Sequence, residues 1–215
     1  MGIFYNTLNL PEKTVTGLEQ MNNLSLKQYK AIDLAMLAVI LAVFEAITSL
    51  AASKWFPLQL FSLSPTITVV CIVMMRWGGW AAIHAVVGGL AFCIATGASP
   101  EQFAIYCVGN CAALLALFFF KYYGKERVRK SWLLTAGFAL TAFCGTMVGR
   151  WAISLIFGGE LTAIVDFFIV DSLTLVFTVL VVLIARKPDG LFEDQKAYLV
   201  RTEDERKRRE DSDVL

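Results

Sequence analysis

Residues 148–172 read VGRWAISLIFGGELTAIVDFFIVDS, two apolar segments joined at a Gly-Gly-Glu turn with one arginine and two aspartates inside them. A charged side chain at bilayer depth costs at least about 2.5–3.5 kcal/mol on insertion scales, so it normally faces a partner charge, a wet cavity or the protein interior. The stretch therefore predicts two membrane helices that fold back on each other around Arg150, Asp166 and Asp171.

The composition of the whole chain supports this interpretation. Of its 215 residues 57% are hydrophobic, and several apolar runs reach about 18 residues or more. We expect a polytopic all-α membrane protein rather than a soluble domain.

The net charge of +1 gives no indication of nucleic-acid binding, because Lys and Arg gather at the two ends and in one loop. All five cysteines fall in apolar segments, which favours buried thiols over a disulfide framework.

Six apolar runs approach the length that crosses about 30 Å of hydrocarbon at about 1.5 Å per residue. They cover residues 31–52, 64–77, 79–97, 101–120, 132–157 and 161–185. The predicted organisation is an N-terminal segment over 1–30, a six-helix transmembrane domain over 31–186 and a charged tail over 187–215. No cleavable signal peptide is expected at the start.

Orientation follows from the positive charges, because short loops rich in Lys and Arg stay in the cytoplasm. Basic residues occupy the leading segment, the turn at Arg76, the loop 121–130 and the tail, whereas the alternate loops hold only Lys54. Both termini are therefore expected in the cytoplasm, which agrees with six spans.

Counting residues inward from the outer end of each span converts sequence position into depth. Arg150 lies about 12 Å down, Asp166 about 9 Å and Asp171 about 16 Å. Glu45 of the first span lies about 10 Å down, and Asn110 of the fourth about 14 Å. Five strongly polar side chains from four helices are thus predicted to share one layer in the outer half of the membrane.

Two interpretations of this layer remain open. In the first, Arg150 forms an ion pair with Asp166 or Asp171 and clamps the last two helices. In the second, the surplus acids and Asn110 line a cavity that opens outward. One arginine cannot neutralise Glu45 and both aspartates, so at least one acid needs a proton, water or a cationic ligand group, which favours the cavity.

Three weaker features lie on the third and fourth spans. Tyr106 and Asn110, four residues apart, offer an aromatic ring and an amide to a planar polar ligand, although Tyr106 also fits an interfacial anchor. His84 lies near the cytoplasmic end and is expected to pack between helices. Cys107 and Cys111 share a helix face, but no histidine or further cysteine lies at their depth, so no metal site is expected.

A stripe of small residues runs along the first predicted helix, formed by Ala31, Ala35, Ala38, Ala42 and Ala46. Small residues at this spacing let another helix approach closely where lipid offers no hydrophobic drive. We predict that this alanine stripe is a docking surface, either within the bundle or for a separate membrane subunit.

These features together resemble the S components, the substrate-capturing subunits of energy-coupling factor (ECF) transporters, a branch of the ABC importers. The resemblance covers most of residues 25–190. It rests on chain length, on six spans with both ends inside and on the Ala-x-x-x-Ala steps of the stripe. It also rests on the loop SKWFPLQLFSLS (53–64) and the glycine-rich turn RWGGWAAIHAVVGG (76–89).

The resemblance implies import of a scarce, vitamin-like micronutrient across a bacterial plasma membrane. In that family the first loop and the last three helices hold the ligand near the outer face. Mapped onto this chain, those positions are Trp55, Gln59, Tyr106, Asn110, Arg150, Asp166 and Asp171, and the depth count adds Glu45. A membrane coupling subunit, docked on the alanine stripe, and two ATPase subunits would supply the energy. This chain has no G-x-x-x-x-G-K-[ST] stretch and is expected to bind no cofactor itself.

Two other classes compete with this interpretation. A membrane enzyme could use the outer acids for acid–base chemistry, but the chain has one histidine, no H-E-x-x-H motif and no Ser-His-Asp set. A structural or regulatory subunit would use the buried charges only as a clamp. We therefore expect a binding subunit rather than an enzyme.

Overall fold

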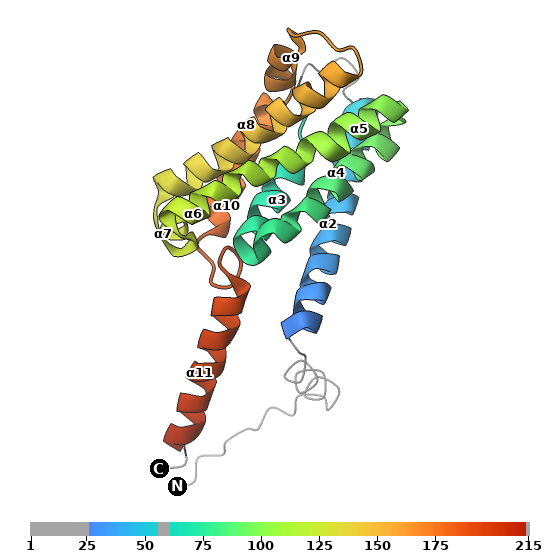
Figure 1. Ribbon diagram of the computed structural model, residues 1–215. Coiled ribbons are helices and arrows are strands. Elements are labelled where there is room, and N and C mark those ends of the chain that lie inside the picture. The colour runs from blue at the N-terminus through green and yellow to red at the C-terminus, as the bar shows by residue number, and fades with distance from the viewer. Residues whose placement is uncertain (1–25, 56–60, 214–215) are drawn as a thin grey trace, which may run out of the picture.

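The computed structural model describes residues 26–55 and 61–213, and every regular element within them is a helix (Figure 1). The elements are α2 Leu26–Trp55, α3 Thr66–Trp77, η1 Gly78–Trp80, α4 Ala81–Thr96, α5 Pro100–Gly109, η2 Asn110–Leu117, α6 Phe118–Tyr123, α7 Lys125–Lys130, α8 Trp132–Ile156, α9 Ala163–Val170, α10 Ser172–Ala185 and α11 Gln195–Asp213. The predicted all-α class is confirmed.

Four helical stretches in the described residues are long and apolar enough to cross a membrane, and a fifth is added if α9 and α10 count as one broken span. By length and composition the four are Leu26–Trp55, Thr66–Thr96, Pro100–Tyr123 and Trp132–Ile156, although the second reverses direction at Gly78 and is not one straight helix. This pattern is compatible with a multi-pass membrane protein. The number of six spans and the cytoplasmic placement of both termini remain predictions.

The predicted second and third spans form a tight hairpin. Gly78 has a φ of 63°, which glycine adopts without strain, and the chain turns there from α3 into α4. A Cβ on Gly88 of α4 would lie 2.1 Å from Thr66 Oγ1 at the start of α3. With 12 and 16 residues, the two helices are about 18 and 24 Å long, each shorter than the hydrocarbon layer.

Helix α3 lies at the centre of the bundle. Nine of its twelve residues are buried, and it contacts α2, α4, α8, η2 and α10. A helix that is apolar all round, as the sequence TITVVCIVMM is, belongs in a core rather than on a lipid-facing surface. The shortness of this segment therefore reflects a core helix enclosed by its neighbours.

Helix α8 and the continuous run α5–η2–α6 lie side by side along their length (Figure 1). Glycines make this contact close. A Cβ on Gly149 would lie 2.4 Å from the carbonyl oxygen of Gly109, and a Cβ on Gly145 would lie 2.6 Å from that of Ala112. The spacing Gly145-x-x-x-Gly149 is the small-residue pattern that brings membrane helices together.

The predicted last span is broken. Helices α9 and α10 meet at Asp171 with a bend of 48°. The backbone N–H of Ser62 donates to the carbonyl of Val170 over 2.7 Å, so the segment before α3 packs against the break. Discontinuous membrane helices are tolerated where the broken backbone lines a cavity or is buried in protein.

Helix α2 packs mainly against α4, and the alanine stripe lies at the edge of the face that α2 buries. Ala38, Ala42 and Ala46 are half-buried, while Ala31 and Ala35 are exposed. The described chain thus covers only part of the stripe.

Candidate functional site

A cavity of about 380 Å³ lies between α2, residues 62–66, α4, α5, η2, α8 and the α9–α10 break. It is near the end of the bundle where α2 and α4 finish and α5 begins. Its volume is at the small end of the range of about 300–1,000 Å³ typical of small-molecule sites. We call it the end cavity.

Arg150 connects three walls of the end cavity and is only 3% exposed. Its Nε donates to Asn110 Oδ1 over 2.8 Å, and its Nη1 donates to Asp171 Oδ2. Its guanidinium carbon lies 4.6 Å from the centroid of the Tyr106 ring, within the range of a cation–π contact. The close contact between α8 and α5–η2 brings Arg150 within reach of Asn110 and Tyr106. This contact requires glycine at position 109, because a Cβ there would lie 2.7 Å from the Arg150 backbone.

Asp171 occupies the break between α9 and α10. Its Oδ1 accepts a hydrogen bond from Ser62 Oγ, and its Oδ2 accepts from Arg150. Thr174, one turn further along, accepts from the backbone N–H of Ser64 over 2.9 Å. The break therefore exposes a carboxylate to the cavity and holds the segment that leads into α3.

Glu45 of α2 is buried at the N-terminus of α3. Its Oε2 accepts from Ser64 Oγ (2.8 Å), Thr66 Oγ1 (2.6 Å) and Thr66 N (3.2 Å). Position 65 is a proline, whose side chain cannot cap the helix, so the Glu45 carboxylate supplies the negative charge that a helix N-terminus favours. Among the described residues, Glu45 Oε1 and Arg150 Nη2 have no hydrogen-bond partner.

The charges of the end cavity do not balance. Its described lining holds two carboxylates, Glu45 and Asp171, and one guanidinium, Arg150. Its other polar groups are neutral hydroxyls, the Asn110 amide and the Tyr106 phenol. One negative charge is therefore left for a proton, water or a cationic ligand group to offset.

The structure brings together most of the residues predicted to bind a ligand. Those that line the end cavity are Glu45, Tyr106, Asn110, Arg150 and Asp171. Asp166 does not line it: this aspartate is exposed on α9, on the far side of the break. Trp55 at the end of α2 is 75% exposed and does not line it either. Gln59 lies outside the described residues.

Sequence reasoning missed the hydroxyl groups that hold the two carboxylates. Ser62, Ser64 and Thr66 supply donors to Asp171 and Glu45, and Gly88 and Phe92 of α4 complete the neighbouring wall. The signal was present as SLSPT, three hydroxyl residues around a proline directly before a short apolar segment.

His84 packs inside the bundle, as predicted. It is fully buried, and its Nε2 lies 3.1 Å from the carbonyl oxygen of Leu34. Cys111 Sγ donates to the backbone carbonyl of Cys107 one turn earlier. Among the described residues, no three His, Cys, Asp or Glu side chains gather where they could hold a metal ion.

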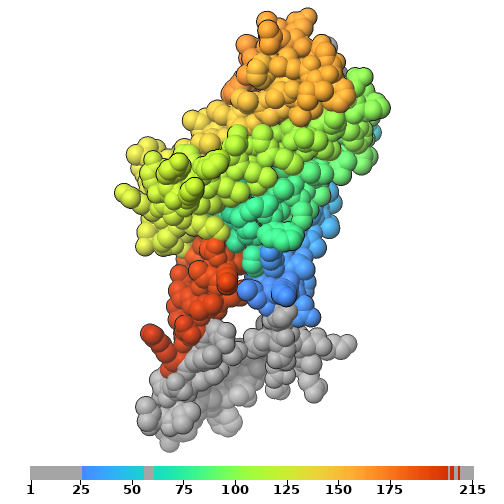
Figure 2. Space-filling view, viewed as in Figure 1, coloured from blue at the N-terminus to red at the C-terminus, as the bar shows by residue number. Residues whose placement is uncertain are grey.

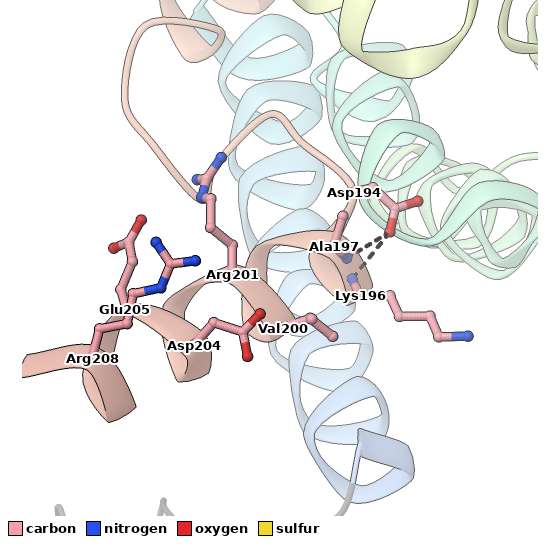
Figure 3. A pocket seen from close by; sticks show the side chains of 8 residues that line it. All are labelled: Asp194, Lys196, Ala197, Val200, Arg201, Asp204, Glu205 and Arg208. Carbon is pink, nitrogen blue, oxygen red and sulfur yellow. Dashed lines mark hydrogen bonds between the residues drawn. The ribbon is translucent and has the colours of Figure 1, made fainter. Parts of the chain in front are cut away.

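A second hollow, of about 640 Å³, runs along α11 outside the apolar bundle (Figure 3). Its charged side chains have both signs, and Asp194 accepts from the backbone N–H groups of Lys196 and Ala197. Burial alone would raise the pKa of Asp194. The hydrogen bond and charge of Lys125, together with these N–H groups, outweigh burial and hold the pKa below its usual value. Because opposite charges offset one another on a single helix face, we prefer the end cavity as the candidate site.

Comparisons with protein-family models, curated proteins and solved structures find no match for this chain.

Proposed function

We propose that this chain is the substrate-binding subunit of an ECF-type importer, and that the end cavity captures a vitamin-like micronutrient from the outer face. A separate membrane coupling subunit and two ATPase subunits would deliver the ligand inward, so the chain itself is no enzyme. The observation that carries the proposal is the buried Arg150, which joins η2, α8 and the α9–α10 break at a cavity with one surplus carboxylate. The family assignment rests on the sequence resemblance.

The groups left free in the end cavity define the ligand that fits it. Arg150 Nη2 suits an acceptor such as a carbonyl or an anionic oxygen, and Glu45 Oε1 suits a cationic or hydrogen-bond donor group. Phe92 and Tyr106, with ring centroids 4.5 Å apart, form an aromatic wall. We therefore propose a small polar ligand that carries a positive or donor group and an acceptor, with an apolar face between them.

The first test is the ligand itself. The full chain, extracted in mild detergent, is expected to carry a small molecule that mass spectrometry detects after denaturation. A ligand-free chain whose melting temperature does not respond to a panel of vitamins and their precursors would contradict the proposal.

Glu45→Gln is expected to weaken ligand binding at least tenfold, which corresponds to about 1.4 kcal/mol. Glutamine keeps the size and can still accept from Ser64 and Thr66, but it removes the charge that meets the ligand cation. Binding is measured by titration of the co-purified molecule into ligand-depleted protein. Asp166→Asn is the matched control, because it removes an exposed acid that does not line the cavity, and equal losses in both variants would count against the site.

A second candidate function is that of a structural subunit. It is favoured by the observation that Asn110, Arg150 and Asp171 bind one another, while Glu45 serves as the charge at the N-terminus of α3. A chain of that kind needs no ligand. The Arg150 variants discussed below separate the two functions.

Docking on the alanine stripe is tested by Ala31→Leu combined with Ala35→Leu. Leucine at these exposed positions would hold a partner helix away, so we expect co-purification with the coupling subunit to be lost from co-expressing cells. Val43→Leu is the control: it also enlarges an exposed side chain of α2, about 100° around the helix from Ala42. Unchanged complex formation in the double variant would exclude docking through this part of the stripe.

A further inference from the structure

A third hollow, of about 320 Å³, lies at the opposite end of the bundle from the end cavity. Its walls are the start of α2, the end of α3 with Gly78, the start of α7 and the start of α11. We call it the basic pocket. Its charged lining consists of Lys27, Lys30, Arg76, Lys125, Lys196 and Asp194.

Two of the five cations are neutralised. Arg76 forms a bidentate ion pair with Asp33, through Nη2–Oδ1 at 2.7 Å and Nε–Oδ2 at 3.0 Å. Lys125 Nζ lies 2.5 Å from Asp194 Oδ2. The charges of Arg76 and Lys125 are therefore offset by carboxylates of the protein itself.

The other three cations, Lys27, Lys30 and Lys196, have no carboxylate within ion-pair distance in the described part of the chain. The Lys30 ammonium is held over the Trp80 ring, 3.9 Å from its centroid. The N-terminal end of α2, which carries the positive end of the helix dipole, lies at the same pocket. With the two ion pairs counted as neutral, the described residues leave the basic pocket with a net charge of about +3.

The two lysine-bearing helices are neighbours at this end of the bundle. Tyr29 of α2 donates to Gln195 of α11 over 3.4 Å, and both helices emerge from the same end of the bundle (Figure 2). A single anion in the pocket is therefore positioned to meet Lys27 and Lys30 from one helix and Lys196 from the other.

Exposed aromatic residues near the basic pocket favour a position at the level of a membrane surface. Trp80 beside it is 52% exposed, and Trp132 and Tyr122, in the segments that lead to and from α7, are 59% and 76% exposed. Exposed Trp and Tyr concentrate where lipid headgroups meet the hydrocarbon layer. The pocket also includes the half-exposed Leu26, which offers an apolar contact next to the charges.

We propose that the basic pocket binds the phosphate of an anionic phospholipid headgroup and so fastens α2 to the start of α11. Basic pockets between membrane helices recognise such headgroups through the same phosphate chemistry that a free phosphate ion would use. The lipid is favoured because the pocket lies beside exposed tryptophans and an apolar side chain. This inference does not depend on the function proposed for the end cavity.

The test uses the full chain in mild detergent with three added probes: phosphatidylglycerol, phosphatidylcholine with the same acyl chains, and inorganic phosphate. Native mass spectrometry counts the bound lipids, and thermal unfolding measures stabilisation. We expect phosphatidylglycerol to bind and to raise the melting temperature, whereas phosphatidylcholine and millimolar phosphate do neither. Equal stabilisation by phosphate, or equal binding of the two lipids, would overturn the proposal.

Three substitutions locate the effect. Lys27→Gln, Lys30→Gln and Lys196→Gln combined are expected to weaken phosphatidylglycerol binding at least tenfold, with the melting temperature in phosphatidylcholine unchanged. The control combination carries the substitutions Lys121→Gln, Arg127→Gln and Lys187→Gln, which remove the same charge from exposed positions outside the pocket. An equal loss in the control would show nonspecific attraction and refute the site.

Two single substitutions at Lys30 cover the case in which the triple variant fails to fold. Lys30→Arg keeps the cation over Trp80 and is expected to retain the preference for phosphatidylglycerol, whereas Lys30→Gln alone is expected to reduce it severalfold. Identical lipid binding by these two variants would overturn the role of Lys30.

Discussion

Gly149→Ala is expected to abolish tight packing of α8 against α5–η2. The new Cβ would lie 2.4 Å from the Gly109 carbonyl oxygen and 2.5 Å from Ala112 Cβ, and backbone atoms cannot rotate away. Overpacking a well-packed contact costs about 1–3 kcal/mol, and a clash with backbone belongs at or above the upper end of that range. We expect a clear fall in melting temperature in detergent and, because Arg150 is the next residue, loss of any ligand from the end cavity.

Gly137→Ala is the matched control on the same helix. There the added Cβ meets the Phe119 ring at 3.5 Å, an ordinary van der Waals distance. Alanine is favoured over glycine inside a helix by about 1 kcal/mol, so this variant should be as stable as the parent or slightly more so. Equal stability of the Gly149 and Gly137 variants would contradict the close approach of α8 to α5–η2.

Counting residues inward from the helix ends predicted most of the residues that line the end cavity, because the count requires only straight helices with a constant rise per residue. Glu45, Arg150 and Asn110 lie on long, unbroken helical stretches, where rise per residue converts sequence position into height. An ionisable residue inside such a stretch must turn toward the protein interior, so equal heights bring these side chains together. The sequence thus predicted a polar layer, although not which side chains pair within it.

The same count failed for Asp166 because the last span is not one straight helix. Residues 161–185 contain neither glycine nor proline, the residues that usually mark a break. The break at Asp171 instead accompanies contacts from the segment before α3, where Ser62 bonds to both Val170 and Asp171. A bend stabilised by a distant segment leaves no local signature.

The sequence also did not predict the core position of α3 or the contact of Gly149 with Gly109, because both depend on which helix faces meet. The short apolar run 64–77 looks the same whether it faces lipid or protein, and the pattern Gly145-x-x-x-Gly149 does not name its partner. The structure supplies that partner, Gly109, one residue before Asn110. Which faces meet is a property of the packed bundle, so neither periodicity nor composition determines it.

Arg150→Gln is expected to have the largest effect on the end cavity. It leaves Glu45 and Asp171 buried without a cation, and removing one partner of a buried ion pair costs about 3–5 kcal/mol. Both the structural and the binding function predict this loss of stability, which is measured as a fall in melting temperature. The single variant alone therefore does not decide between them.

The double variant Arg150→Gln with Asp171→Asn separates the two functions. It replaces both charges by neutral amides. The introduced asparagine can still accept from Ser62, and the introduced glutamine can still bond to Asn110, so most of the lost stability should return. If Arg150 serves as a ligand contact, binding stays at least tenfold weaker in this stable protein, since no guanidinium remains to meet the ligand acceptor. Recovery of both stability and binding would instead make the Arg150–Asp171 pair a clamp and would exclude Arg150 as a ligand contact.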